Sequence, residues 1–419
     1  MVSTPYLMAG IVNNEFPHSL LPDQRDLQRF RITTETERTL LLRHEFPAEG
    51  INLNPGTLAT VPASVHHAMQ LYRNHHLCAF PLSHYQAGRH LRDEIRRLIR
   101  RIFNVPVGHR ISLGGGTSAL AELLATHLAT SLLRAGHSGP IRMLATDAEH
   151  KGGLGAFTGH RDYEVRQLTQ EERRNPARFT EICAEFQPDA AFFSTVTWIT
   201  GEEPPLREWY ACLKQKRPRC LIIQDAAQAA GLLPLDFNAA DITLASGHKW
   251  LHGPHGCGFF IGHQDAVNRL DPRPGSAGEG PPWGENQGGR DFATDAGFLM
   301  ALAIQETAGT EDILQRSLAL RDYFLGHLFR LSPAAATLWQ GQAGLGPGCV
   351  FLPFGKQDPW PVYDQLNRRG IYGKCIKEPG FSGMRFGFPW FETFARMDDA
   401  ARHVAAALAG AGIKAKGVA

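Results

Sequence analysis

Residues 242–262 read ITLASGHKWLHGPHGCGFFIG, an apolar run that ends at a polar cluster and gives way to a glycine-rich turn. The run has the length and character of a buried strand, and Lys249 follows it directly after Ser246, Gly247 and His248. A lysine in this place is either an ordinary loop cation or an amine held for covalent chemistry. The sequence on both sides distinguishes these two interpretations.

Short apolar runs alternate with helical patterns from about residue 110 to 262, as βαβ units do. RISLGGGTSALAELLATHLATSLL (110–133) is expected to form a strand, a glycine turn and an amphipathic helix. Four more strands, each ending in polar or small residues, are expected within IRMLATDAEH (141–150), DAAFFSTVTWIT (189–200), CLIIQDAAQ (220–228) and DITLASGHK (241–249). In an open, mostly parallel sheet, ligands bind at the carboxyl edge of the strands. The sequence therefore predicts an α/β fold with its chemically interesting residues on one sheet edge.

The remaining segments predict how the chain divides into domains. Residues 272–292 are rich in Gly and Pro and are expected to form a long loop. The section 301–419 combines strand-like GCVFLPF and GMRFGF with a final helical pattern, which predicts a small α+β domain. We expect a large domain over 51–300 and an N-terminal segment, 1–50, that packs on the small domain.

The charge balance argues against nucleic acid and membrane partners. Lys and Arg number 43 and Asp and Glu number 41, so the formal charge is +2 and no net field attracts a polyanion. The basic stretch RHLRDEIRRLIRR (89–101) carries apolar residues at helical spacing and is interpreted as a solvated helix face.

Cysteine and histidine usage predicts a cytoplasmic protein without a metal. The seven cysteines are scattered and form no C-x-x-C pair, which is typical of reduced thiols. The first residues show no basic leader before an apolar run, and no segment has 18 uninterrupted apolar residues. The 19 histidines fall in neither an H-E-x-x-H motif nor a zinc-finger spacing, so no metal is expected.

Three motifs offer groups for a phosphorylated ligand. GGGTSALAELL (114–124) places Thr117 and Ser118 at the start of a helix, where free N–H groups and the helix dipole attract phosphate. Asp225 follows an apolar strand, with Gln228 three residues later, and His150 follows another strand. Each motif alone also fits an ordinary structural role, namely a capped turn, a helix cap or a packed histidine.

Together the motifs match the chemistry of pyridoxal 5'-phosphate (PLP). Its aldehyde takes a lysine amine, its ring nitrogen takes a carboxylate, and its phosphate takes helix-end N–H groups and hydroxyls. Lys249, Asp225 and the 114–124 turn supply these groups, and His150 supplies a ring for stacking. The joint pattern therefore predicts a PLP enzyme with Lys249 as the covalent anchor.

Over roughly residues 50–400 the chain resembles the class V aminotransferase family of fold-type I PLP enzymes, and within it the isopenicillin N epimerase-like branch. The matching segments are NLNPGTLATVP, GGGTSALAELLA, TDAEHKGGLGAF, STVTWITGEEPPL, DAAQAAGLLPLD and SGHKWLHGPHGCGFFIG. The resemblance implies a mostly parallel seven-stranded sheet in the large domain, a small C-terminal domain, and an amino-acid substrate. It also implies a homodimer with active sites at the interface.

The resemblance assigns roles to individual residues. Lys249 is similar to the Schiff-base lysine, Asp225 to the partner of the ring nitrogen, Gln228 to the residue bonded to the ring hydroxyl oxygen, and His150 to the stacking imidazole. The remaining cofactor contacts implied by the resemblance are Thr117, Ser118, Ser246 and His248 at the phosphate, Thr294 from the neighbouring subunit, and Thr197 near the cofactor oxygen. Arg385 matches the arginine that clamps the substrate carboxylate, and Asn54 matches a residue lining the substrate pocket.

The implied reaction begins with removal of the Cα proton of an α-amino acid by Lys249, which leads to a quinonoid. Reprotonation then gives epimerisation, loss of a side-chain group gives β-elimination such as carbon-sulfur lysis, and protonation of the cofactor gives transamination. The branch favours epimerisation. Persulfide-forming desulfuration is the least expected outcome, because Cys375 lacks the Gly-His-Cys context of the desulfurase branch.

Two other protein classes make different predictions. A dinucleotide-binding oxidoreductase needs an acidic residue about 20 positions after the glycines, where this chain has AGHSGP (135–140). A non-catalytic protein with the PLP-enzyme fold has no need of Lys249 and Asp225. Because both residues are present, an enzyme is expected.

Overall fold

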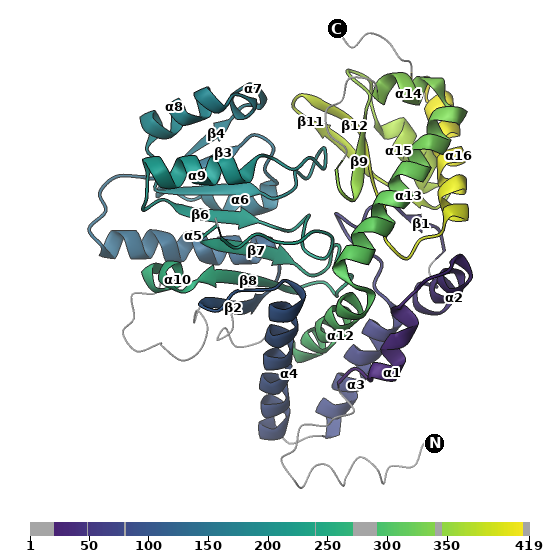
Figure 1. The fold of residues 1–419 in the computed structure, drawn as a ribbon, viewed down its shortest axis with the longest axis horizontal. Coiled ribbons are helices and arrows are strands. Elements are labelled where there is room, and N and C mark those ends of the chain that lie inside the picture. The colour runs from purple at the N-terminus through teal and green to yellow at the C-terminus, as the bar shows by residue number, and fades with distance from the viewer. Residues whose placement is uncertain are drawn as a thin grey trace.

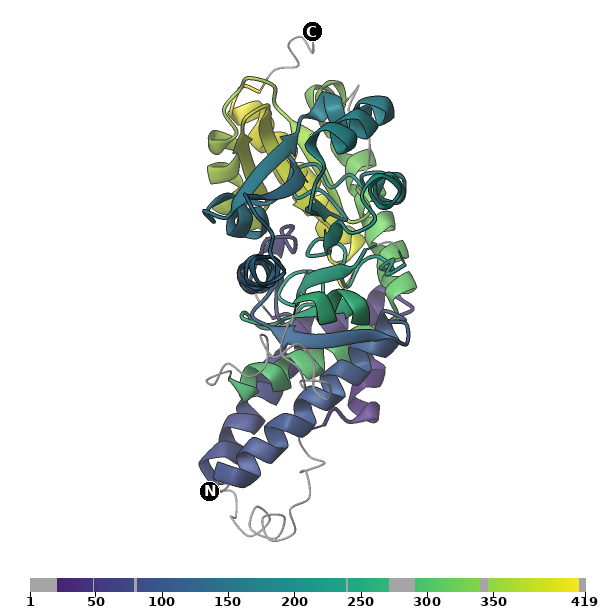
Figure 2. The ribbon, with the colours of Figure 1, turned by 90° about the vertical axis from the view of Figure 1, so that its left-hand side faces the viewer.

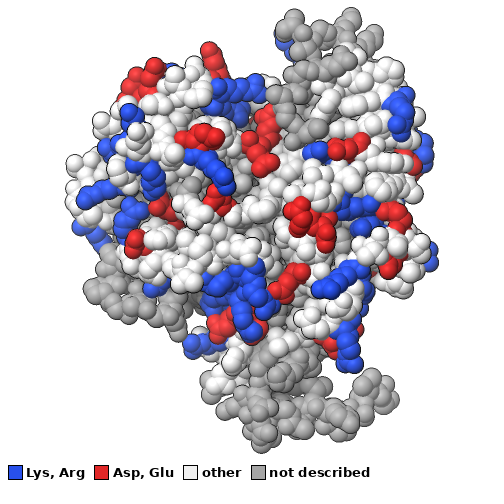
Figure 3. All heavy atoms as spheres, in the orientation of Figure 1, with Lys and Arg blue, Asp and Glu red and all other residues white. Residues whose placement is uncertain are grey.

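The computed structural model describes residues 21–47, 49–78, 81–238, 240–270, 291–339 and 346–413. The loop expected over 272–292 lies outside the described residues, except for its last two positions. Within the described ranges, no helix has the length and apolar character needed to cross a membrane. Basic and acidic side chains are interspersed on the face shown in Figure 3, as the near-zero net charge leads one to expect.

A seven-stranded sheet forms the centre of the larger part of the molecule (Figure 1). In spatial order its strands are β2 (His109–Gly114), β8 (Gly258–His263), β7 (Ile242–Ser246), β6 (Leu221–Asp225), β5 (Ala190–Ser194), β3 (Ile141–Thr146) and β4 (Tyr163–Leu168). From β7 to β4 all neighbours are parallel, whereas β8 runs antiparallel to both β7 and β2. The central strands β5, β6 and β7 are buried along their whole length, as parallel strands covered on both faces must be.

Helices pack on the sheet through two apolar clusters. One contains side chains of α5 (Thr117–Arg134), α6 (Lys151–Thr158) and α10 (Gln264–Leu270). The other contains side chains of α8 (Pro176–Phe186) and α9 (Leu206–Lys216), which follow the short α7 (Gln170–Arg174). Apolar residues at helical spacing in these segments explain why each helix turns one face to the sheet.

A helical layer extends below the sheet in Figures 1 and 2. It consists of α3 (Ala63–Cys78), α4 (Pro81–Ile102) and α12 (Phe292–Ala308), with α12 packed against the other two. The N-terminal α1 (Gln24–Leu27), η2 (Gln28–Phe30) and α2 (Glu35–Glu45) contact this layer. They also reach the C-terminal part, since Glu35 pairs with Arg316 at 2.7 Å and Phe46 stacks on Phe391.

The C-terminal part has its own core. Its elements are α13 (Thr310–Leu331), α14 (Pro333–Trp339), β9 (Cys349–Pro353), α15 (Trp360–Asn367), β10 (Ile371–Tyr372), β11 (Lys374–Glu378), β12 (Phe381–Gly387) and α16 (Phe394–Gly410). The strands form an antiparallel sheet in the order β11-β12-β9, and the short β1 (Ile51–Asn52) pairs with β10. The expected fold class, a mostly parallel sheet with a smaller α+β part, is confirmed.

Helix α13 passes from one core to the other. Ile313 near its beginning belongs to the core of the helical layer, whereas Leu320 and Phe324 belong to the C-terminal core. Gly309, with φ of +82°, separates α12 from α13, a backbone conformation that glycine adopts without steric cost. The division of the chain at residues 50 and 300 remains a proposal.

Candidate active site

A cavity of about 190 Å³ lies where the carboxyl ends of the central strands meet the C-terminal sheet. Nine of the predicted site residues line it: Thr117, Ser118, His150, Asp225, Gln228, Ser246, His248, Lys249 and Arg385. Asp225 is the last residue of β6 and Ser246 the last of β7, so parallel pairing brings both strand ends to the same edge. The structure thus gathers residues that are far apart in the sequence.

Asp225 and Lys249 form the electrostatic centre of the cavity. Asp225 is 5% exposed, and its Oδ1 accepts a hydrogen bond from the N–H of Ala227 at 2.8 Å. Burial raises the pKa of Asp225 and lowers the pKa of Lys249, although each charge partly stabilises the other. Both groups are therefore shifted towards their neutral forms. A cationic ring nitrogen beside Asp225 would favour the ionised carboxylate.

The beginning of α5 provides an anion-binding turn beside this pair. Gly116 precedes the helix with φ of +108° and supplies no side-chain cap, so the first turn offers N–H groups to a ligand. Ser246 Oγ accepts a hydrogen bond from the N–H of Thr117 at 3.0 Å and lies 3.0 Å from Thr117 Oγ1. A Cβ at position 116 would lie 3.3 Å from Ser246 Oγ, so glycine keeps this approach open.

His248 lies beside the anion-binding turn and carries an unused ring nitrogen. Its Nδ1 is buried and has no hydrogen-bond partner among the described residues, and its ring stacks on His255. Burial, with the charge of Lys249, lowers the pKa of His248 to about 4. The ring is consequently neutral at physiological pH, and one of its nitrogens is a donor suited to an anionic ligand.

His150 is placed at the N-terminus of α6 by its own hydrogen bond. Its Nδ1 accepts from the N–H of Gly152 at 3.0 Å, and its ring contacts the ring of Trp198 edge-on at 5.1 Å. The side chain faces the cavity, yet loss of solvent and the charges of Lys249, Arg385 and Lys374 lower the pKa of His150 to about 4. The ring is therefore neutral, which suits stacking against a cationic ring.

Gln228 retains one donor for a ligand. Its Nε2 donates to the carbonyl of Gly56 at 2.7 Å, and its Oε1 accepts from Trp250 Nε1 at 3.1 Å. An amide nitrogen has two hydrogens, so the second is available towards the cavity that Gln228 lines. These two bonds hold the amide in one orientation.

Arg385 reaches the cavity from β12 and is held by neutral oxygens. It is 3% exposed. Its guanidinium donates to the carbonyl of Trp198, to Asn54 Oδ1 at 3.1 Å and to Thr57 Oγ1 at 3.3 Å. No acidic side chain among the described residues pairs with it. A buried guanidinium without a carboxylate is suited to bind the carboxylate of a ligand.

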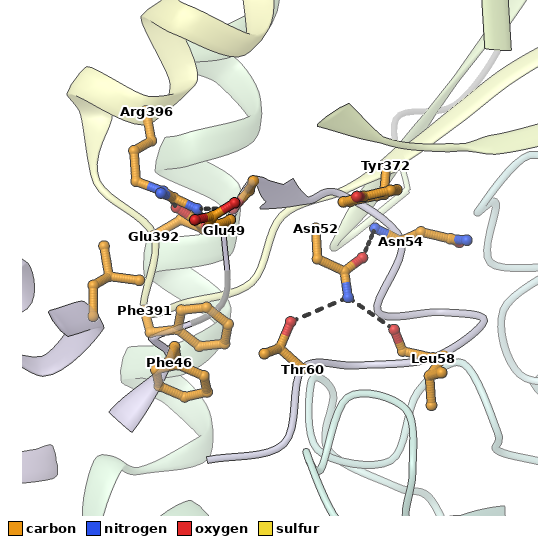
Figure 4. Close-up of a pocket in the computed structure, with 12 residues that line it drawn as sticks. Phe46, Glu49, Asn52, Asn54, Leu58, Thr60, Tyr372, Phe391, Glu392 and Arg396 are labelled. Atoms are coloured by element: carbon orange, nitrogen blue, oxygen red, sulfur yellow. Dashed lines mark hydrogen bonds and ion pairs between the residues drawn. The ribbon is translucent and has the colours of Figure 1, made fainter. Parts of the chain in front are cut away.

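Three predicted residues do not line the cavity. Asn54 touches it indirectly through Arg385 and lines a second cavity of about 290 Å³, where its N–H donates to Asn52 Oδ1 (Figure 4). The hydroxyl of Thr197 bonds to that of Thr200 at 2.7 Å. Thr294 lies in the first turn of α12, and its hydroxyl donates to Asp291. The expected role of Thr294 involves a second subunit. The assignments of Thr197 and Thr294 to the cofactor both stay predictions.

The structure adds residues that the sequence did not single out. Gly56, Thr57, Trp198 and Lys374 line the cavity. Trp198 directly follows the predicted Thr197, so the prediction missed the side chain that lines the cavity by one residue. Lys374 carries no local signal, because only the pairing of β11 with β12 brings it to the cavity.

The donors and acceptors present fit PLP. Asp225 presents a carboxylate, Lys249 a partly buried amine, and the start of α5 with Ser246 and His248 an anion site. A Cβ at position 153 would lie 3.2 Å from Asp225 Oδ2 and 2.9 Å from Phe192 Cζ, so Gly153 leaves room next to the carboxylate. Within the described ranges, no group of three or more His, Cys, Asp and Glu side chains is arranged to hold a metal ion.

Residues 51–372 match the model of the family described as Aminotransferase class-V, and the chain belongs to this family. An isopenicillin N epimerase of Streptomyces clavuligerus is 28% identical over 63% of this chain and 65% of its own length. One of Amycolatopsis lactamdurans is 36% identical over 47% of this chain and 45% of its own length. The chain thus spans less than two thirds of either relative.

Other relatives carry different names. A probable hercynylcysteine sulfoxide lyase of Mycobacterium tuberculosis is 29% identical over 46% of this chain and 50% of its own length, and several relatives are named cysteine desulfurases. Among solved structures, a mutant of C-DES with glycine covalently linked to the PLP-cofactor has a TM-score of 0.72 at 21% identity, covering 87% of this chain and 98% of that one. This likeness supports the fold.

Proposed function

We propose that this enzyme acts on an α-amino acid by removing its Cα proton and returning a proton to the opposite face, which is epimerisation. As a class V aminotransferase-fold enzyme, the chain is PLP-dependent. The observation that carries the proposal is that three groups line one cavity: the partly buried amine of Lys249, the buried carboxylate of Asp225, and the buried guanidinium of Arg385, which has no carboxylate partner among the described residues.

Each part of the cofactor has a residue to hold it. Lys249 would attach to the aldehyde, Asp225 would bind the ring nitrogen, and His150 would cover the ring. The start of α5 would bind the phosphate together with Ser246 and His248. Bound PLP supplies an electron sink for the bond that breaks at Cα.

Removal of the Cα proton from one face is assigned to Lys249, and epimerisation further requires a second proton donor on the opposite face, a role to which no residue is assigned. Burial and the nearby Arg385 charge lower the pKa of the Lys249 amine, and a neutral amine is a competent general base near neutral pH. Arg385 fixes the substrate carboxylate and thereby orients the Cα–H bond. Asn54, Thr57 and Trp198 hold the guanidinium in place for this task.

Carbon-sulfur lysis is the second candidate function. It is supported by the relative named a sulfoxide lyase, and it uses the same first proton transfer. Desulfuration through a persulfide is disfavoured here, because burial raises the pKa of Cys375, the thiol nearest in sequence to the desulfurase cysteine, to about 11. A thiol with this pKa is protonated at neutral pH and is a poor nucleophile.

A panel of L-amino acids and S-conjugates incubated in deuterated water separates the outcomes. Epimerisation gives D-amino acid labelled at Cα, elimination gives a released thiol or similar fragment, and transamination gives a keto acid. The Lys249→Ala variant is the control and should lose the covalent attachment that borohydride fixes. A wild-type protein that remains colourless after incubation with PLP contradicts the proposal.

We also propose a cytoplasmic homodimer. The reduced-thiol pattern of the seven cysteines supports the location. The position of Thr294 on α12, away from the cavity of its own chain, supports a role in a neighbouring subunit's site. A light-scattering mass close to 46.2 kDa, the mass of one chain, contradicts the dimer.

A further inference from the structure

Lys374 is a second cation of the substrate cavity. It begins β11 and pairs directly with Arg385 of β12 in the antiparallel register. Residues opposite each other in such a pair have Cβ atoms about 5 Å apart and project from the same face of the sheet. Both side chains accordingly line the same cavity.

The cavity carries more positive than negative charge. Apart from Lys249 and Asp225, which the cofactor would engage, the charged side chains among its described lining residues are the cations Lys374 and Arg385. The two histidines, with pKa values lowered to about 4, add no charge at neutral pH. Like charges directly opposite on two strands destabilise a sheet, so the folded chain maintains the Lys374 and Arg385 pair at a cost.

No described acidic side chain forms an ion pair with Lys374, although the charge of Glu378 partly stabilises its ammonium. Its ammonium has no hydrogen bond or ion pair among the described residues, whereas Glu378 on the same strand is already paired with Lys151 at 2.8 Å. Burial, together with the Arg385 charge, lowers the pKa of Lys374. Arg385 in turn contacts only neutral oxygens. The indole N–H of Trp198, which also lines the cavity, has no acceptor in the described part of the chain.

We propose that Lys374 makes the enzyme select amino acids that carry a second anionic group, a carboxylate or a sulfur oxyacid, on the side chain. The inference rests on the proposed function, in which Arg385 takes the α-carboxylate. One carboxylate satisfies the Arg385 fork and leaves Lys374 without a counter-ion. A lysine ammonium is a point charge on a flexible stem, so it can accept carboxylate and sulfinate or sulfonate groups at somewhat different distances.

Binding of unreactive acids to the PLP-loaded enzyme tests this selection. Calorimetry compares butyrate, which has one carboxylate, with succinate and glutarate, which have two, and with 4-sulfobutyrate, which adds a sulfonate. A partly exposed ion pair contributes up to about 1 kcal/mol and a charge-assisted hydrogen bond somewhat more, so the diacids should bind about five- to tenfold more tightly. Lys374→Met should reduce this ratio to near one, and Lys374→Arg should keep most of it.

Lys377→Met is the matched control, because Lys377 lies on the same strand but pairs with Asp358 at 2.7 Å outside the cavity. It should leave the ratio unchanged. Equal binding of butyrate and the diacids by the wild type, or an unchanged ratio in Lys374→Met, overturns the inference. Loss of binding for all acids in Arg385→Met, with the visible absorbance intact, shows that the proposed site stands independently of Lys374. An enzyme that never binds PLP contradicts the proposed function instead.

Discussion

Glu149 offers a sharp test of the electrostatics behind the site. Its carboxyl group is 8% exposed and lies between β3 and β5. Oε1 accepts from Thr146 Oγ1 at 2.7 Å, and Oε2 accepts from the N–H of Ser194 at 2.9 Å and from its hydroxyl. Burial raises the pKa of Glu149 from 4.5 to about 7, and the charge of the neighbouring Asp225 contributes to the rise.

This rise in pKa sets how stability depends on pH. Because the folded state binds the proton of Glu149 more tightly than the unfolded state does, the contribution is fully present below pH 4.5 and is lost as the pH rises through about 7. Each pKa unit corresponds to about 1.4 kcal/mol, so ionised Glu149 lowers the free energy of unfolding by about 3 kcal/mol at pH 8. At pH 4 the carboxyl of Glu149 is protonated and does not lower the free energy of unfolding.

The isosteric Glu149→Gln variant isolates the pH-dependent contribution of the Glu149 carboxyl to the free energy of unfolding. A glutamine reproduces the protonated acid, since its oxygen accepts from Ser194 and its nitrogen donates to Thr146 Oγ1. Urea denaturation of the PLP-loaded proteins should find the two equally stable near pH 4 and the variant about 3 kcal/mol more stable at pH 8. Titrating groups that do not interact with Glu149 are shared and cancel in the difference.

Glu149→Ala is the control for the hydrogen bonds themselves. It leaves the buried Ser194 N–H without an acceptor. At every pH it should therefore be about 1–3 kcal/mol less stable than Glu149→Gln, which also carries no charge at this position. A Glu149→Gln variant that is less stable than the wild type at pH 8, or a stability difference that does not change with pH, refutes the reasoning about the buried carboxyl.

Three further changes test the assigned roles. Asp225→Asn keeps an acceptor for the Ala227 N–H but removes the charge. The value of kcat/KM should fall at least about 100-fold, with little change in the unfolding midpoint. A large drop in the unfolding midpoint contradicts the catalytic role. Arg385→Met removes the guanidinium that binds the substrate carboxylate and should weaken amino-acid binding about 100-fold. Arg385→Lys should recover only part of the lost affinity. Unchanged affinity, measured by titration of the visible spectrum, contradicts the role of Arg385 in carboxylate binding. Cys375→Ser should leave product formation unchanged at pH 7 to 8, because the raised pKa keeps the thiol protonated, and loss of activity implies a nucleophilic thiol.

The cofactor half of the site could be predicted because its residues follow strands. Asp225, Ser246 and Lys249 each come at or just after an apolar run, and the parallel order of the strands brings such positions to one edge. The glycine turn before α5 is equally local in the sequence. A strand pattern alone was therefore enough to collect these groups, once the chemistry of one ligand connected them.

The substrate half could not be predicted in the same way, because its contacts depend on distant pairings. Lys374 reaches the cavity only through its register with Arg385, and Trp198 contributes a backbone carbonyl to Arg385, 187 positions away. Glu149 finds its hydrogen-bond donors 45 residues later, at Ser194. The periodicity within one segment does not predict which residues of another segment will lie opposite it in the folded chain.

The way Arg385 is held has a consequence for which molecules can enter. A free arginine side chain loses up to about 2 kcal/mol of rotamer entropy when it is immobilised, and here that ordering occurs when the chain folds, since the carbonyl of Trp198, Asn54 and Thr57 already fix the guanidinium. An incoming carboxylate consequently meets a rigid fork and bears little of that entropic cost itself. The same rigidity lowers the affinity for amines without a carboxylate, because the guanidinium of Arg385 cannot move to a solvated position when no anion binds it.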